Sequence, residues 1–252
     1  MKKNRKKAII IEILLVLAVA AVVVAVVIGV GSTEETPETA GSETPANTGE
    51  SAAAGIGETE QTATYMIKYD ATWSAETHPE TLPEGAHVSP IFVVAHANEG
   101  DLFAAGTAAT EGIEIMAETG ATAVLADEVG ANPSILDSTV GSLINVPGSI
   151  ELEIELDQDH PLLSAVSMLA PSPDWFVAVS NVELFRDGQW LEEVSLAVRP
   201  YDSGTDSGAT FTADDLETDP AGVIGSPADD SFTDAAAENR FATITLTKKK
   251  PG

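Results

Sequence analysis

An alternation of apolar and polar side chains, repeated along most of the chain, limits this sequence to a fold made of half-buried strands. Between residues 63 and 73 apolar side chains occupy every second position, with Lys68 and Asp70 among the polar residues between them. Residues 150–156 repeat the pattern, with three glutamates separating the apolar side chains. Successive side chains of a strand point to opposite faces. We therefore expect one buried and one solvated face along both segments.

Four more segments are predicted strands. Residues 90–97, 164–169 and 242–247 have strand composition, and the last should be the final strand of the fold. Residues 175–179 are apolar throughout, which is typical of a strand buried on both faces at the centre of a sheet. A further set of side chains is expected to share one buried face: Trp190, Val194, Leu196 and Val198.

The connections predict how these strands pair. Asp187-Gly188, between Phe185 and Trp190, is a strong signal for a two-residue hairpin turn. Residues 105–119 break the alternation and predict one short helix. Short antiparallel strands with loops at two ends indicate an all-β fold, either a sandwich or a barrel. We assign this folded domain to residues 63–248.

The amino-terminal residues predict a membrane anchor and a tether. Residues 1–7 form a basic cytoplasmic leader, and residues 8–30 are apolar except for Glu12. At about 1.5 Å per residue this segment spans roughly 34 Å as a helix, enough to cross a hydrocarbon core of about 30 Å. The basic leader places the rest of the chain outside the membrane. Residues 31–62, rich in Thr, Glu, Ser and Pro, predict a disordered linker roughly 30 Å from end to end.

Two alternatives remain open for the apolar segment. If residues 1–30 act as a cleaved signal peptide, the domain is secreted, although no clear small-residue cleavage site follows the segment. The glutamate early in the apolar run is also similar to the pattern of type IV pilins. In that pattern glycine precedes the cleavage point, whereas Lys7 and Ala8 stand here.

The charge balance restricts the partners. Forty Asp and Glu face twelve Lys and Arg, a net charge of −28. Such a chain repels nucleic-acid phosphates, so we expect no nucleic-acid partner. It also repels anionic lipid head groups unless a divalent cation lies between them. Adaptation to a saline habitat and simple solubility explain the charge equally well. The chain has no cysteine, which excludes disulfides and thiolate metal sites.

Two acidic loops carry the candidate metal ligands. Asp174 ends the stretch Pro-Ser-Pro-Asp at the mouth of the expected central strand, and Asp202 and Asp206 flank Gly204 in a second loop that continues to Gly208. Glycines in the left-handed conformation would let this loop curl so that both carboxylates face one point. Calcium prefers six to eight oxygen ligands. In so acidic a chain, a solvated turn is the alternative interpretation.

The same two loops carry a family resemblance. The stretches PSPDWF and PYDSGTDSG closely resemble loops of the spondin amino-terminal domain. Other motifs of that domain follow in the same order, and the resemblance covers about residues 63–246. These motifs are Thr77-His78-Pro79, Ala86-His87-Val88-Ser89-Pro90, Ala95-His96-Ala97-Asn98, Leu102-Phe103-Ala104-Ala105-Gly106 and Ala117-Glu118-Thr119-Gly120.

The resemblance implies an antiparallel β-sandwich similar to calcium-dependent lipid-binding sandwiches. It also implies one bound Ca²⁺, held by Asp174, Asp202 and Asp206. Two positions depart from the family, with Ser203 where alanine is common and Ala178 where glycine is common. Animal members are secreted matrix proteins of cell adhesion, and they carry cysteines that this chain lacks. Their partners are therefore not transferred to it.

Three functions are weighed from these observations. The first is a calcium-binding adhesion or ligand-binding module at the cell surface, with a glycan, matrix or surface-protein partner. The second is a calcium-stabilised structural spacer of the cell envelope. The third is a carboxylate-dependent hydrolase, but no cysteine, GxSxG or nucleotide-binding loop supports it, so we expect no enzyme. The four histidines lack close ligand spacing, and we expect buried or turn-forming roles for them.

Overall fold

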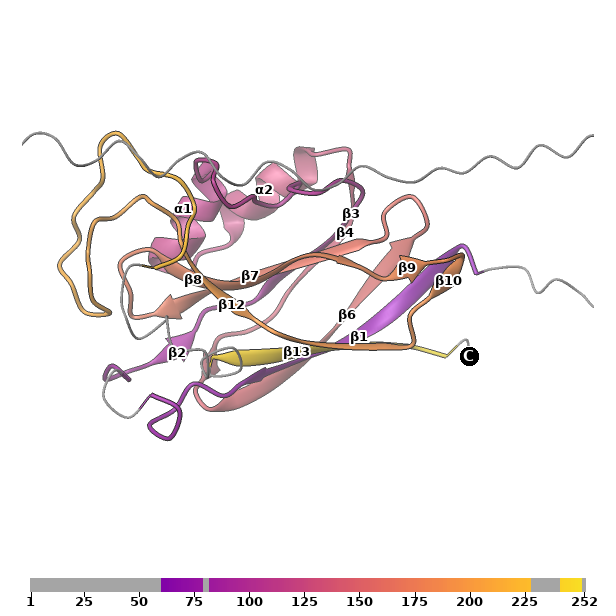
Figure 1. Cartoon of the computed structure of the whole chain (residues 1–252), viewed down its shortest axis with the longest axis horizontal. Helices are drawn as coiled ribbons and strands as arrows, with labels where there is room; N and C mark the ends of the chain where they lie inside the picture. Colours follow the sequence, from indigo (N-terminus) through magenta and orange to yellow (C-terminus); the bar gives the residue numbers. More distant parts are fainter. Residues whose placement is uncertain (1–59, 79–81, 228–240, 251–252) are drawn as a thin grey trace, which may run out of the picture. The chain divides into compact units, whose positions relative to one another are not determined.

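Two antiparallel sheets pack face to face, and two helices cover the outer face of one of them (Figure 1). The structure is a computed structural model that describes residues 60–78, 82–227 and 241–250. The predicted leader, anchor and nearly all of the linker lie outside these residues. Within the described ranges, no helix has the length and apolar character needed to cross a membrane.

The first sheet has the strand order β11-β13-β1-β6. Its strands are β1 (Thr62–Ala71), β6 (Gly148–Asp157), β11 (Glu193–Ala197) and β13 (Ala242–Lys248). The predicted alternation is confirmed, because Tyr65, Ile67 and Tyr69 are buried while the three glutamates of β6 are exposed. Strand β1 begins at Thr62, the last residue of the predicted linker. The final strand is also confirmed as β13.

The second sheet is built around β7, which pairs with β8 on one side and with β2 and β3 on the other. β12 pairs with β8, β4 with β3 and β5 with β2. Its strands are β2 (His87–Val88), β3 (Phe92–His96), β4 (Ile135–Val140), β5 (Ile144–Asn145), β7 (Leu162–Ala170), β8 (Trp175–Glu183) and β12 (Arg199–Asp202). The predicted central position of residues 175–179 is confirmed, since β8 lies between β7 and β12.

Strand β8 is apolar on both faces because it separates two apolar clusters. Trp175 and Val177 belong to the larger cluster, between the two sheets. Phe176 belongs to the second cluster, which lies beneath the helices with Ile113 and Met116. The predicted common face of Trp190, Val194, Leu196 and Val198 is confirmed, because all four join the larger cluster.

The short helix predicted within residues 105–119 is confirmed as α1, but the expectation of a single helix was wrong, because the described residues form two. α1 (Glu111–Thr119) begins later than predicted, where the Thr110 hydroxyl accepts a bond from the Ile113 N–H. α2 (Ala123–Ala131) was missed. Only Leu125 and Val129 of α2 are buried, so its apolar stripe is one side chain wide and gives a weak periodic signal.

The Asp187-Gly188 hairpin is confirmed between β9 (Phe185–Arg186) and β10 (Gln189–Trp190). Asp187 and Gly188 have φ of 53° and 75°, as a tight hairpin turn with two left-handed residues requires.

The sandwich has two distinct ends, joined by strand β7. At the amino-terminal end, β1 begins and Thr62 pairs with Asp157, just before the turn that leads into β7. At the other end, which we call the loop end, β7 runs into residues 171–174, and β12 runs into the long loop that starts at Ser203. Figure 1 shows this long loop at the left of the molecule, away from the start of β1. The two candidate metal loops therefore share the end of the fold opposite the start of β1.

Candidate metal centre

Asp174 is held in the short loop between β7 and β8, and its side chain is fully buried. Its Oδ2 accepts bonds from the backbone N–H groups of Thr205 and Asp206, at 2.9 and 3.1 Å, and from the Ser203 hydroxyl at 3.0 Å. Its Oδ1 is also buried, yet it has no hydrogen-bond partner in the described part of the chain. Buried polar atoms are nearly always paired, so this oxygen needs a physical explanation.

The second loop packs directly on the first. The Ser203 N–H donates to the backbone carbonyl of Asp174 at 3.2 Å, which ties the end of β12 to the loop before β8. Gly204 has φ +76°, and a Cβ there would lie 2.9 Å from the backbone N and O of Val223. The left-handed conformation predicted for this glycine is therefore confirmed.

The same prediction was wrong for Gly208, which does not adopt a positive φ. This glycine is needed for space instead of backbone conformation. A Cβ at Gly208 would lie 2.8 Å from the Pro173 side chain and 2.9 Å from the Asp206 carboxylate. Gly208 thus lies where the two acidic loops touch.

The carboxylates of Asp202 and Asp206 accept from donors of their own loop, and Asp202 also accepts from β8. Asp202 accepts from the Gly204 N–H at 2.8 Å and from the Trp175 indole N–H at 3.3 Å. Asp206 accepts from the N–H groups of Gly208 and Leu216, both at 2.6 Å. Each carboxylate oxygen keeps acceptor capacity, because it has more than one lone-pair direction.

The three carboxylates share one electrostatic environment. Burial raises the pKa of Asp202, and the negative charges of Asp174 and Asp206 raise it further. Within the described residues, however, no group of three or more acidic or histidine side chains stands in ready-made ligand geometry. The structure thus brings the three predicted aspartates into neighbouring loops at one end, each still oriented by its own donors.

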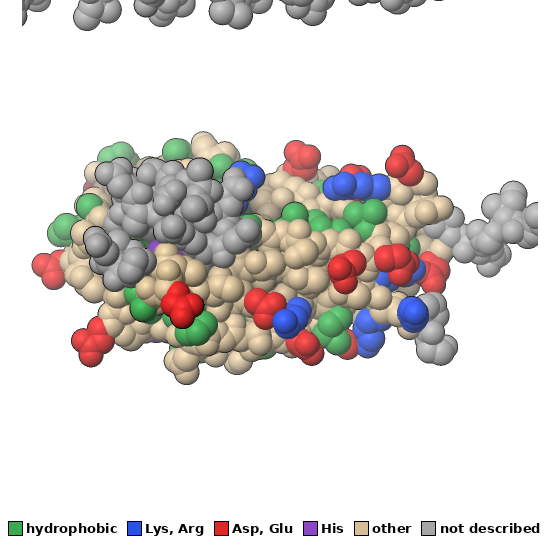
Figure 2. Space-filling view, turned by 60° about the horizontal axis from the view of Figure 1, so that its bottom comes forward, with side chains coloured by type: hydrophobic (Ala, Val, Ile, Leu, Met, Phe, Trp, Pro, Cys, Tyr) green, Lys and Arg blue, Asp and Glu red, His purple; other side chains and the backbone are tan. Residues whose placement is uncertain are grey.

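The residues fit a hard divalent cation in two respects. All candidate donors are carboxylate, hydroxyl or carbonyl oxygens, the ligands that calcium prefers. The unpartnered Oδ1 of Asp174 is the buried acceptor that such an ion would satisfy. Surface charge alone does not distinguish the site, because acidic side chains are scattered over the face shown in Figure 2, with Lys and Arg among them.

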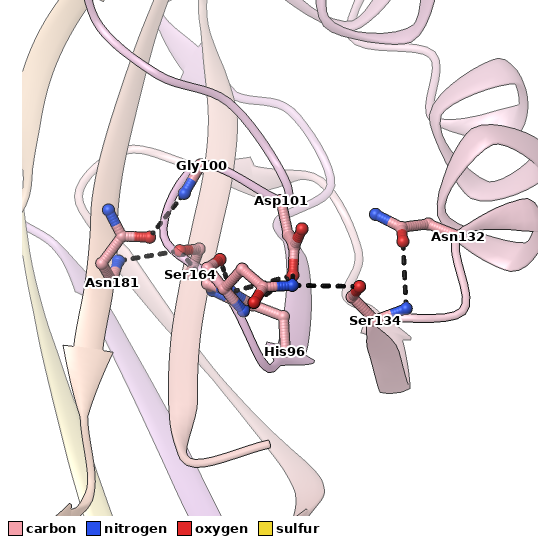
Figure 3. A network of polar contacts seen from close by, with 8 residues as sticks. His96, Gly100, Asp101, Asn132, Ser134, Ser164 and Asn181 are labelled. Atoms are coloured by element: carbon pink, nitrogen blue, oxygen red, sulfur yellow. Dashed lines mark hydrogen bonds and ion pairs between the residues drawn. The ribbon is translucent and has the colours of Figure 1, made fainter. Parts of the chain in front are cut away.

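A second polar network lies around the buried side chain of His96 (Figure 3). His96 pairs with Leu162 at the start of β7, near the amino-terminal end. The His96 Nδ1 lies 2.9 Å from the Asn98 carbonyl and must donate to it, so the neutral ring accepts at Nε2 from the Ser164 hydroxyl, 2.8 Å away. Ser164 in turn accepts from the Asn181 N–H at 2.9 Å. Asp101 lies 4.0 Å from Nδ1.

This Ser-His-Asp grouping differs from a nucleophile triad. Ser164 and His96 are both buried, and the His96 Nδ1 is engaged by a backbone carbonyl in preference to the carboxylate. The roles predicted for the histidines are confirmed. His78 and His96 are buried, whereas His87 and His160 bond to residues two and three positions earlier in turns.

An antiparallel sandwich with two acidic loops at one end defines an all-β domain of the kind that the sequence predicted. The sequence model of the family described as Spondin_N matches residues 63–246, and the chain belongs to this family. The predicted family is therefore confirmed.

The chain is similar to two kinds of curated relative. It is 32% identical to Spondin-2 of Homo sapiens over 170 residues, which cover 64% of this chain and 51% of that protein. It is 30% identical to Spondin-1 of Gallus gallus over 169 residues, which cover 63% of this chain and 21% of that protein. The chain thus spans about half the length of Spondin-2 and about a fifth of Spondin-1.

Sequence reasoning missed the polar groups behind Asp174. Ser203 was noted only as a departure from alanine, yet its hydroxyl bonds to Asp174. Thr205 was passed over, although its backbone N–H donates to the same carboxylate. Nothing in the sequence shows that a residue thirty-one positions later supplies this donor. Only the pairing of β8 with β12 brings the two loops together.

Proposed function

We propose that this chain is a calcium-binding module of the cell surface and that Asp174, Asp202 and Asp206 supply its carboxylate ligands. The observation that carries the proposal is the fully buried Oδ1 of Asp174, which has no partner among the described residues. Leaving such an acceptor unpaired costs about 1–3 kcal/mol, more when it is charged. A bound cation removes this penalty.

Calcium suits the donor set better than the common transition metals. The chain contains no cysteine, and the two loops offer only oxygen donors. When bound, the ion supplies two positive charges that offset the repulsion among the three aspartates and order the loops. Its affinity should lie in the range of extracellular calcium modules, with Kd of about 10⁻⁴–10⁻³ M.

The placement of the loops supports a binding role for this end of the domain. Strand β1 begins at the opposite end of the sandwich, and the predicted linker joins the domain there. A tethered domain would then present its calcium loops away from its point of attachment. We propose a glycan, matrix or surface-protein partner at the loop end, with residues 8–30 as the membrane anchor. If residues 1–30 are removed, the same module is secreted.

We propose neither a catalytic role nor a nucleic-acid partner. Ser164 and His96 are both buried, and their hydrogen bonds are those of a structural network. The net charge of −28 opposes association with phosphate backbones.

Calorimetric titration of the full chain with calcium tests the proposal. Asp202→Asn removes a ligand charge, while Asp215→Asn makes the same change at an exposed position of the same long loop. We expect Asp202→Asn to weaken calcium binding about tenfold or more and Asp215→Asn less than about twofold, because ligand charge sets affinity in such sites. A wild-type chain that ignores millimolar calcium contradicts the proposal.

A chelator experiment separates the binding module from the structural spacer. Both functions predict that calcium raises the melting temperature. Only the binding module predicts that the chain attaches to a glycan or matrix array, and that a chelator abolishes this attachment while circular dichroism shows an intact fold. Attachment that survives chelation, or no attachment at all, favours the spacer.

A further inference from the structure

Two large apolar side chains are exposed on the long loop at the loop end. Leu216 is 53% exposed and Val223 is 55% exposed, more than any other large apolar side chain that the structure describes. The other exposed ones, Leu136, Val140 and Leu143, lie on β4 or in the turn that follows it. Single exposed apolar side chains are common on proteins. The position of Leu216 and Val223 beside the acidic loops is what distinguishes them.

Leu216 is bonded directly to the second acidic loop. Its N–H donates to the Asp206 carboxylate at 2.6 Å, and its carbonyl accepts from the Ser207 N–H at 2.9 Å. Two residues later, the Thr218 N–H donates to the Thr205 carbonyl at 2.8 Å. The backbone around Leu216 is thus fixed on the candidate metal loop, while its side chain faces solvent.

Val223 borders the same loop through a different contact. The Gly222 N–H donates to the Gly204 carbonyl at 2.7 Å, and a Cβ at Gly204 would lie 2.9 Å from the Val223 backbone. The next residue, Ile224, is buried beneath the helices, and its N–H donates to the Thr107 carbonyl at 2.8 Å. Because the backbone is anchored, little conformational entropy is lost when a partner covers the Val223 side chain.

The long loop is acidic around these two side chains. Residues 203–227 contain Asp206 and four exposed carboxylates, and they contain no Lys or Arg. The exposed carboxylates are those of Asp214, Asp215, Glu217 and Asp219. A divalent cation held by three aspartates offsets only two of their charges, so the surface stays negative with the ion bound. A complementary partner therefore carries positive charge.

These features distinguish among classes of partner. An anionic lipid surface is repelled by the exposed carboxylates of the loop. Sugars typically stack on exposed aromatic rings, but every aromatic side chain among the described residues is buried or half-buried. A protein surface can supply both apolar side chains to cover Leu216 and Val223 and Lys or Arg to face the carboxylates.

We propose that the loop end docks a protein whose apolar surface patch is bordered by lysine or arginine. Leu216 and Val223 are the apolar contacts of this docking surface, and the exposed carboxylates of the long loop are its charged rim. The inference rests on the proposed function and deepens it by selecting a protein among the partners considered there. The Asp206 carboxylate binds the Leu216 N–H, so order in the calcium loop extends to the docking surface.

The test measures how the full chain binds two synthetic peptides in calcium, by fluorescence anisotropy at about 0.15 M salt. One peptide alternates Leu and Lys, and the other has Ser in place of every Leu, so the two carry equal charge. We expect the wild type to bind the Leu-Lys peptide about tenfold more tightly, because only this peptide buries apolar surface. Leu216→Ser combined with Val223→Ser should abolish most of this preference.

Leu136→Ser is the matched control, because it makes the same change at an exposed position of β4 near the amino-terminal end. It should change the affinity for the Leu-Lys peptide less than about twofold. The combined variant should keep the calcium affinity of the wild type, since backbone groups and not these side chains contact the acidic loop. Asp215→Asn should weaken binding of both peptides, and more so at low salt, because a rim charge acts on either one.

The outcomes are distinct. An equal preference for the Leu-Lys peptide in the wild type and the combined variant overturns the inference, as does a wild type that does not discriminate between the peptides. Attachment to phosphatidylserine vesicles or to a neutral glycan array that is lost in the combined variant also overturns it, and assigns the surface to lipid or glycan. Calcium titration of the wild type decides the proposed function separately. A chain that ignores calcium but prefers the Leu-Lys peptide through Leu216 and Val223 contradicts the calcium site and leaves the docking surface standing.

Discussion

The two ends of strand β7 carry two buried polar networks that differ in one respect. Near its start, Ser164 joins His96 and Asn181 in a network where the serine hydroxyl and both ring nitrogens have partners. Just past its end, Asp174 is equally buried, but one carboxylate oxygen has no partner in the described structure. Ser164 and Ala170 are six residues apart, roughly 20 Å along a strand.

This difference distinguishes a structural network from a candidate binding site. A fully paired buried network fixes a unique arrangement of strands and has nothing left to offer a ligand. A network with one unpaired acceptor lowers the stability of the fold unless something binds there. By this criterion the His96 network is part of the scaffold, and the Asp174 network is the candidate for binding.

Removing the Asp174 carboxylate should have the largest effect on stability, and it is the most direct test of the comparison. Asp174→Ala leaves the N–H groups of Thr205 and Asp206 and the Ser203 hydroxyl without their acceptor, so we expect a loss of about 3 kcal/mol in chelator. It should also abolish stabilisation by calcium, which for the wild type is about 2.7 kcal/mol at a hundredfold excess over Kd. Urea unfolding with and without calcium measures both quantities.

Asp174→Asn is the matched control for that experiment. The amide oxygen can replace Oδ2, and the amide nitrogen would take the place of the unpartnered Oδ1. We therefore expect the free energy of unfolding in chelator to fall by about 1 kcal/mol only, while the stabilisation by calcium is still lost. If Asp174→Asn keeps the full response to calcium, Asp174 is not a ligand.

Breaking the His96 network should have a smaller effect that does not depend on calcium. His96→Leu removes the acceptor of the Ser164 hydroxyl proton and the donor to the Asn98 carbonyl, which should cost about 2 kcal/mol both in calcium and in chelator. His87→Leu, which loses one bond to the Gly85 carbonyl near the surface, should cost less than about 1 kcal/mol. A calcium-dependent loss in His96→Leu would show that the two ends of the sandwich are coupled.

The comparison also shows how much of the structure can be predicted from the sequence. Alternation in β1 and β6 and the Asp187-Gly188 turn depend on neighbouring residues, so pattern alone predicts them. The two acidic loops were found through composition and family resemblance. Helix α2 was missed because its buried stripe is narrow, and the partners of Asp174 were missed because they depend on tertiary packing. Whether a buried carboxylate oxygen has a partner is a property of the folded chain, which a one-dimensional pattern does not contain.

Acidification should give the smallest effect, and it tests the comparison at the His96 network. Burial lowers the pKa of His96 from 6.5, and His160 lowers it further, whereas the Asn98 carbonyl and Asp101 oppose the shift. The unfolded chain therefore binds this proton more readily than the folded one, so the contribution of neutral His96 is fully present above about pH 6.5 and declines below it.

The expected loss is at most about 1.4 kcal/mol at pH 5.5, because the unfolded histidine sets the limit. It should be measured by urea unfolding in chelator as the difference between the wild type and His96→Gln, since the carboxylates titrate in both chains and cancel. Protonated His96 would have two donors facing the Ser164 hydroxyl and the Asn98 carbonyl, and the ring would lose its acceptor at Nε2. Equal pH dependence in the two chains would mean that the His96 network accommodates the proton without loss of stability. The contrast between a fully paired network at His96 and an incomplete one at Asp174 would then be weakened.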